Sequence, residues 1–192
     1  MTKANFWKSV AVAAAVAAAA GPAISGNSGD YLAARQARLS SDYDAAVYYY
    51  VRALGADPQN PALLEGAALS QLSAGDLSRA VAVAERMEAA GVESQISQAI
   101  LSAHEFQTGN FQAVLDRVAA DHGVGPLVDG LMAAWAEVGK GEMANALVSF
   151  DQVAQTKGLR GFALYHKALA LAMVGDFEAS EAIYSDSSAG PL

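Results

Sequence analysis

The histidines are the residues best suited to metal binding or acid–base chemistry. His104 and Glu105 open the segment HEFQT, which resembles the start of a zinc-protease helix but lacks its second histidine. His122 stands in the segment ADHGVG, and His166 lies far beyond it in ALYHKAL. Because no two of the three histidines have a ligand spacing, the sequence predicts no metal site and no catalytic residues of this kind.

Two glycine-containing segments invite comparison with phosphate-binding loops. GVGPLVDG, which starts at Gly123, has the wrong glycine spacing for a dinucleotide loop, and no strand precedes it. EVGKGE, which starts at Glu137, lacks the upstream glycine and the Ser or Thr after the lysine that a phosphate loop requires. Carboxylate pairs such as Asp42 and Asp44 fall on turn positions, where solvation explains them. We therefore expect a non-catalytic protein without a cofactor.

Composition excludes further classes of protein. Apolar residues make up 53% of the 192 residues, which is too many for a disordered chain. The net charge of −8 argues against a nucleic-acid partner, since binding to phosphates needs a basic surface. The absence of cysteine excludes disulfides, thiolate metal sites and a lipid-modified N-terminal cysteine.

The first 25 residues have the order of a secretory signal. MTKANFWKS carries two lysines, the apolar run VAVAAAVAAAA follows, and Gly21 and Pro22 end it. The run is shorter than the roughly 20 residues that a membrane span needs. Ala23-x-Ser25 offers a cleavage site, after which the mature chain would begin at Gly26. We expect export to the periplasm or cell envelope; an alanine-rich helix that continues the fold, in a cytoplasmic protein, is the alternative.

One pattern recurs at a fixed period along the rest of the chain. The segment SSDYDAA around Asp42 returns as AGDLSRA around Asp76 and as TGNFQAV around Asn110, a spacing of 34 residues. KGEMANA follows after a spacing of 32, and VGDFEAS after 34 more. In each copy a glycine or another small residue can end one helix by adopting a left-handed backbone conformation. The polar residue after it can cap the start of a second helix. Apolar residues on both sides have helical spacing, so the sequence predicts an all-α solenoid.

These units resemble the tetratricopeptide-repeat family. The small residue of the family's first helix is matched by Ala34, Ala68, Ser102, Ala134 and Ala168. The alanine of its second helix is matched by Ala46, Ala80 and Ala146, whereas Val114 and Ser180 depart from it. The aromatic one turn later appears as Tyr50, Phe150 and Tyr184, but as Ala84 and Val118 in the middle repeats. The family's leucine-glycine pair is largely absent, and its closing proline appears only as Pro58.

The resemblance covers residues 27–192 and implies a right-handed superhelical solenoid of about five helix-turn-helix repeats. We expect residues 1–25 to be the signal and residues 27–192 to be the repeat domain. The repeats are expected at about 27–60, 61–94, 95–126, 127–160 and 161–192.

The resemblance also implies a scaffold whose first helices line a concave groove for a protein or peptide partner. The residues predicted to bind it are Tyr31, Arg35, Leu69, Phe106, Met132, Trp135, Phe162, Tyr165, His166 and Leu169. Ile96, Ala99 and Leu131 belong to the same inner row, and core packing explains Ile96 and Leu131. This row is apolar or aromatic in the last three repeats, which favours an apolar or amphipathic partner segment.

Two residues of this groove have special weight. Arg35, with Arg38 one turn later, is the only groove residue able to hold a carboxylate, so we expect no two-carboxylate clamp of the chaperone-binding kind. Trp135 is expected to contribute most to binding, because central tryptophans often dominate interface energies.

The alternative is an architectural array with no peptide ligand of its own. Only SDSSAGPL follows the last predicted helix, whereas a solenoid needs a polar outer face on its terminal repeats. We therefore expect Leu164, Leu171 and Ile183 to be partly exposed. The chain would then be the N-terminal part of a longer repeat protein or would self-associate through this end.

The signal predicts where a reporter fused to residues 1–25 will be active. A reporter that works only outside the cytoplasm should be active when it follows these residues, and removal of the two lysines and the apolar run should abolish its activity. Activity confined to a cytoplasmic reporter would contradict export.

Overall fold

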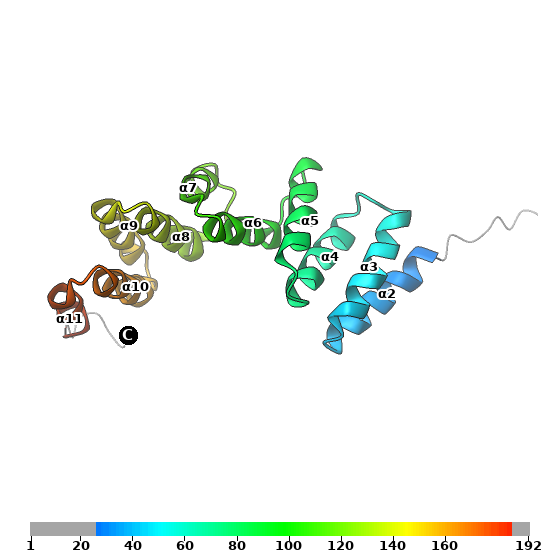
Figure 1. Ribbon diagram of the computed structural model, residues 1–192, viewed down its shortest axis with the longest axis horizontal. Helices are drawn as coiled ribbons and strands as arrows, with labels where there is room; N and C mark the ends of the chain where they lie inside the picture. Colours follow the sequence, from blue (N-terminus) through cyan, green and yellow to red (C-terminus); the bar gives the residue numbers. More distant parts are fainter. Residues whose placement is uncertain (1–25, 186–192) are drawn as a thin grey trace, which may run out of the picture.

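The structure is a computed structural model that describes residues 26–185, and the proposed signal lies outside this range. Helices joined by turns make up the described residues (Figure 1). In chain order the helices are α2 (Gly26–Leu39), α3 (Tyr43–Ala56), α4 (Pro61–Ser73), α5 (Leu77–Ala89), α6 (Gln95–Gln107), α7 (Phe111–Ala119), α8 (Pro126–Gly139), α9 (Met143–Gln155), α10 (Arg160–Met173) and α11 (Phe177–Ser185). None of these helices is long and apolar enough to cross a membrane.

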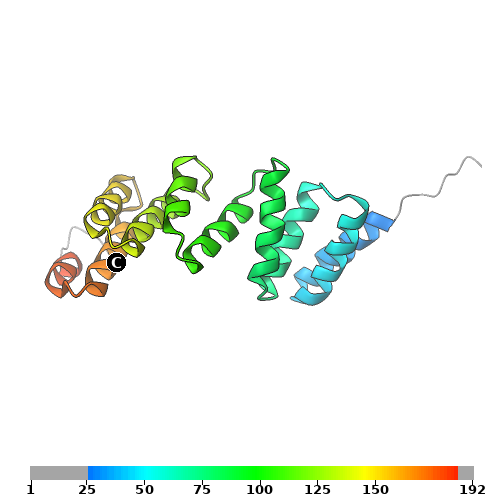
Figure 2. The ribbon, with the colours of Figure 1, turned by 45° about the horizontal axis from the view of Figure 1, so that its top comes forward.

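The helices form successive antiparallel pairs in one elongated row (Figure 2). Each pair packs on the next, and the first helices of neighbouring pairs also meet where α2 packs on α4, α4 on α6 and α8 on α10. The all-α solenoid predicted from the 34-residue spacing is confirmed. We call α2, α4, α6, α8 and α10 the first-helix row.

The recurring turn has the geometry that its residues favour. Gly75 adopts a φ of 84°, which is accessible to glycine at little cost, and ends α4. Asp76 then caps α5 by accepting a hydrogen bond from the backbone N–H of Arg79 at 3.0 Å. In the first pair Ser41 takes the place of the glycine at a φ of 59°, and Asp42 caps α3 in the same way.

Small buried residues lie where the two helices of each pair cross. The small first-helix residues of the family pattern are at most 1% exposed in every pair. The matching second-helix positions are also buried, including the two that depart from alanine, Val114 and Ser180. The hydroxyl of Ser180 donates to the backbone oxygen of Ala168 at 2.9 Å, so its burial leaves no unpaired donor. The helices can approach closely at these positions because no large side chain separates them.

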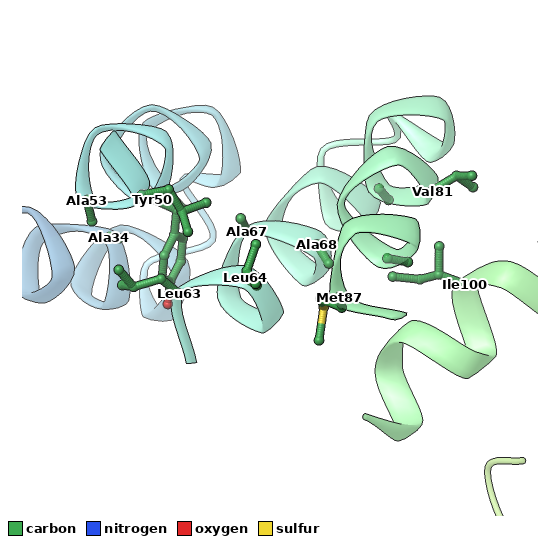
Figure 3. Close-up of a cluster of buried hydrophobic side chains, with 14 of the residues drawn as sticks. Ala34, Tyr50, Ala53, Leu63, Leu64, Ala67, Ala68, Val81, Met87 and Ile100 are labelled. Atoms are coloured by element: carbon green, nitrogen blue, oxygen red, sulfur yellow. The ribbon is translucent and has the colours of Figure 1, made fainter. Parts of the chain in front are cut away.

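The core is divided into two clusters. One cluster joins α2 to α6, and Figure 3 shows Tyr50, Leu64, Met87 and Ile100 within it. The Tyr50 ring fills the space beside Gly66, where a Cβ atom would lie 2.4 Å from the ring. The second cluster joins α8, α9 and α10 around Phe150. Between the clusters α6 and α8 make almost no contact, although α7 packs on α8.

Arg117 links the helices at this division. Its Nη2 donates to Glu105 Oε1 at 2.7 Å and its Nη1 to Gln98 Oε1 at 2.7 Å, both on α6. Nη1 also binds Glu88 on α5. Burial lowers the pKa of Arg117, but the hydrogen bonds to Glu105 and Glu88 more than offset this effect and leave the pKa raised. A buried charge of this kind is tolerated because it is fully paired.

A matched pair of buried serines on α6 tests the packing. Among the described residues, Ser102 has the one buried side-chain polar atom without a hydrogen-bond partner, whereas the Ser97 hydroxyl donates to the Ser94 oxygen at 2.8 Å. Ser102→Ala should therefore raise the free energy of unfolding by about 1 kcal/mol, and Ser97→Ala should lower it by about 1 kcal/mol. Urea unfolding of both variants measures this difference. Equal destabilisation by the two substitutions would contradict the packing described for Ser102.

Candidate functional site

The site is built on α8, which is held at its start by an ordered loop. Gly125 precedes the helix, and Pro126 begins it, where a missing N–H is no loss. The Asp129 carboxylate accepts hydrogen bonds from the backbone N–H groups of Val124 at 2.7 Å and Gly125 at 3.0 Å. The GVGPLVDG segment is thus the connection between the third and fourth helix pairs.

One side of α8 forms the floor of an apolar groove of about 680 Å³. Residues of α6 and α7 form one wall, and residues of α10 form the other. The lining residues are Phe106, Phe111, Leu127, Val128, Leu131, Met132, Trp135, Val138, Gly139, Phe162, His166 and Met173. We call this surface the α8 groove. Its lining is apolar except for His166 and the Trp135 N–H, so it suits hydrophobic contact and not charge-based catalysis.

Trp135 connects the floor of the α8 groove to the core. Its Nε1–H donates to His166 Nδ1 at 3.1 Å. Its ring centroid lies 5.8 Å from that of Phe150, and the two rings are nearly perpendicular, as favoured by aromatic pairs. Phe150 is fully buried, so truncation of Trp135 would also disturb the second core cluster. Trp135 therefore has a structural role besides any contribution to binding.

His166 is held in its uncharged form by this arrangement. Burial lowers the pKa of His166 below its ordinary value of 6.5. Nδ1 must be unprotonated in order to accept the hydrogen bond from Trp135. The nearest charged neighbour along α10, Lys167, is paired with Asp151 at 2.7 Å. The groove thus remains apolar at neutral pH.

The structure brings together half of the predicted binding residues. Phe106, Met132, Trp135, Phe162 and His166 line the α8 groove. Leu131, for which core packing was expected, lines it as well. Tyr165 and Leu169 are exposed on the same helix as Phe162. Tyr31, Arg35 and Leu69 lie on α2 and α4 and take no part in this groove.

Several lining residues were missed. They are Phe111, Leu127, Val128, Val138, Gly139 and Met173. Those on α8 could have been found from their helical spacing around Trp135, since they share one broad face of the helix. The sequence pattern places Phe111 only in the recurring turn. Its position in the groove depends on how α7 packs against the neighbouring helices, which the sequence pattern does not show.

The residues considered for catalysis have other surroundings. His104 lies on α6, His122 follows α7, and His166 contacts Trp135. Glu105 is a partner of Arg117. Within residues 26–185 no group of three His, Cys, Asp or Glu side chains could hold a metal ion.

Comparison with known proteins agrees with this architecture. Residues 37–102 match the family model described as tetratricopeptide repeat. No curated protein sequence matches the chain significantly.

Solved structures extend the likeness beyond the matched residues. A crystal structure of MamA protein is 18% identical, with a TM-score of 0.69, and the match covers 83% of this chain and 88% of that one. MamA 41-end from Desulfovibrio magneticus RS-1 is 11% identical, with a TM-score of 0.69 and coverage of 83% and 92%. At these identities the likeness concerns the fold. The chain thus resembles the tetratricopeptide-repeat family over residues 37–102 and shares the fold of these solved structures over most of its length.

Proposed function

We propose that this protein is a non-catalytic scaffold that binds an apolar or amphipathic segment of a partner protein in the α8 groove. The observation that carries the proposal is the open apolar lining of this groove. Phe162 is 58% exposed and Met173 is 65% exposed, although both border a concave surface. Contiguous apolar surface of this kind is uncommon on soluble proteins unless it binds something.

The dimensions of the groove favour a helical occupant. The lining residues of α8 run from Leu127 to Gly139, which corresponds to about 18 Å of helix. About three turns of a partner helix would span this length. An amphipathic helix would place its apolar face on α8 and leave its polar face in solvent.

The expected affinity is modest. If the partner covers about 350 Å² of apolar surface, the gross gain is about 9 kcal/mol. Association costs of about 4–15 kcal/mol consume much or all of this gain. Binding should therefore be micromolar or weaker unless contacts outside the groove contribute.

The N-terminal sequence supports a location in the periplasm or cell envelope. The lysines, apolar run and small residues before Gly26 have the order of an export signal. The partner segment would then belong to a protein of the same compartment.

A self-assembling or architectural array is the second candidate, and the last helix pair favours it. Phe177 and Tyr184 are 70% and 51% exposed, whereas Tyr50 and Phe150, which hold the position of Tyr184 in other repeats, are buried. The expectation that Leu171 is partly exposed was wrong, because this residue of α10 is buried. Leu164 and Ile183 are half-buried, as expected. The exposed rings could pack on a further repeat or a second copy.

Phe162 provides the clearest test of the groove. Phe162→Gln should weaken the binding of a fluorescein-labelled 18-residue amphipathic peptide of Leu, Phe, Ser and Gln by about tenfold, equivalent to ~1.4 kcal/mol. Fluorescence anisotropy measures the dissociation constant. The matched control is Val148→Gln, because Val148 is similarly exposed, at 55%, but lies outside the groove.

Two results would speak against the groove as the binding surface. One is equal binding by the Phe162 and Val148 variants. The other is absence of peptide binding by the unaltered protein, as the architectural alternative predicts. Thermal unfolding checks that both variants keep their fold.

The pKa of His166 predicts how stability and binding change with pH. Because the pKa is lowered on folding, the neutral ring contributes stability that is present above pH 6.5 and is lost as the pH falls below that value. Protonation also removes the acceptor for Trp135 and places a charge in the groove, so peptide binding should weaken over the same range. His166→Phe should lack this component. An unchanged pH profile in the His166→Phe variant would contradict the role of His166.

A further inference from the structure

One ring nitrogen of His166 has no hydrogen-bond partner within residues 26–185. The other, Nδ1, accepts the hydrogen bond from the Trp135 Nε1–H at 3.1 Å, so the proton of the neutral ring is on Nε2. In this range Ser102 has the one buried side-chain polar atom without a partner, so the unpaired Nε2 is open to solvent. The Nε2–H of His166 is therefore a donor that a bound molecule can reach.

The direction of this donor is fixed by the packing of the ring. Besides donating its N–H, Trp135 meets the His166 ring at nearly a right angle, with centroids 6.1 Å apart. The Tyr165 ring contacts it in the same way, with centroids 5.4 Å apart. Trp135 is itself packed on the buried ring of Phe150. A donor held from several sides is already oriented for its acceptor and loses little freedom when the acceptor binds.

The surroundings of this donor are apolar. Within the described part of the chain, the lining of the α8 groove contains no Asp, Glu, Lys or Arg, and the Trp135 N–H is already bonded to His166. The rest of the lining is apolar, including Met132 and Phe162. A hydrogen bond made in such surroundings is stronger than in water, and a polar group left without a partner there is costly. One directed donor in an apolar groove therefore discriminates between the groups that can lie opposite it.

An uncharged oxygen is the group that fits this donor. A carboxylate would lose its hydration without meeting a free cation, because Lys167, the neighbour of His166 on α10, is paired with Asp151 at 2.7 Å. Lysine and arginine side chains offer only donors. The backbone oxygens of a partner helix are used within that helix. The acceptor must then be a Ser, Thr, Asn or Gln side chain.

We propose that the Nε2–H of His166 binds one uncharged side-chain oxygen on the apolar face of the partner segment and thereby sets the register of that segment in the α8 groove. This inference rests on the proposed function, because it names the chemistry of the segment that the groove holds. The partner helix carries a single polar residue among apolar residues spaced three and four apart, and this residue faces α10. A single polar position in an apolar seam fixes the register of paired helices in the same manner.

Two peptides that differ in one atom test the donor. Both derive from the labelled amphipathic peptide and carry, at one position of its apolar face, either O-methylserine or norvaline. The first has an ether oxygen, which accepts hydrogen bonds but cannot donate, and the second has a methylene group in its place. Each position of the apolar face is exchanged in turn, and fluorescence anisotropy is measured at about pH 8, where the histidine ring is neutral.

The expected result is a preference at one position of the peptide. There the O-methylserine peptide should bind about fivefold more tightly than the norvaline peptide, the usual effect of one hydrogen bond. At the other positions it should bind more weakly, because its oxygen is buried without a donor.

Two variants separate the donor from the ring that carries it. His166→Phe keeps an aromatic ring beside Trp135 and Tyr165 but has no donor, so the preference for the O-methylserine peptide should disappear. His166→Gln places an amide N–H near the position of Nε2 and should restore part of the preference. Thermal unfolding checks that both variants keep their fold.

NMR spectra of the unaltered protein, labelled with ¹⁵N-histidine, give an independent measurement. Long-range ¹H–¹⁵N correlations should identify the Nε2–H tautomer of His166. The Nε2 resonance should shift when the O-methylserine peptide binds, while the resonances of His104 and His122, which lie outside the α8 groove, stay unchanged.

Three results would overturn the inference: no peptide position that favours O-methylserine, a preference that survives in His166→Phe, or a His166 ring that carries its proton on Nδ1. Each leaves binding of the norvaline peptide intact, so the proposed function stands. If His166→Phe does not fold, the position scan and the tautomer in the unaltered protein decide the question. Failure of the norvaline peptide to bind the unaltered protein at any position would sink the proposed function, and this inference with it.

Discussion

Close crossing of the two helices in each pair is the constraint on which the rest of the structure depends. The residues at the crossing are small and fully buried in all the described pairs, from Ala34 in α2 to Ala168 in α10. A larger side chain there would separate the helices and change the angle at which the next pair packs. Since each pair contacts mainly its neighbours, a local change of this kind would propagate into the curvature of the whole row.

The third helix pair shows what happens when the repeat is shortened. Its second helix, α7, has 9 residues, whereas α3, α5 and α9 have 13 or 14. The shorter helix covers less of α6, and the paired charges around Arg117 hold it in place. The same interruption leaves α6 and α8 apart and opens the apolar surface along α8. An irregularity in the repeat thus coincides with the candidate binding site.

The fold followed from the sequence because its determinants are local and repeated. The turn around Asp76, the helix caps and the small residues each recur. A repeat that matches the pattern weakly is therefore still recognised from its spacing to the other repeats. Half of the predicted groove residues also lie in the α8 groove, because the repeat register fixes which face of a first helix looks inward. The remainder depended on tertiary packing. Phe111 of α7 lines the groove beside Phe106 of α6, and the contact of Trp135 with Phe150 joins α8 to α9.

The central claim, that the α8 groove is the surface that meets the partner, is tested most directly by site-specific photo-cross-linking in the native host. A p-benzoylphenylalanine residue would replace Val128, which lines the groove and is partly exposed, or Val148, which is exposed outside it. The account predicts that the probe at position 128 forms a discrete adduct whose cross-linked peptide, identified by mass spectrometry, is an apolar or amphipathic segment of another protein. Cross-links from position 148 alone, or equal cross-links from both positions to the same peptide, would contradict it.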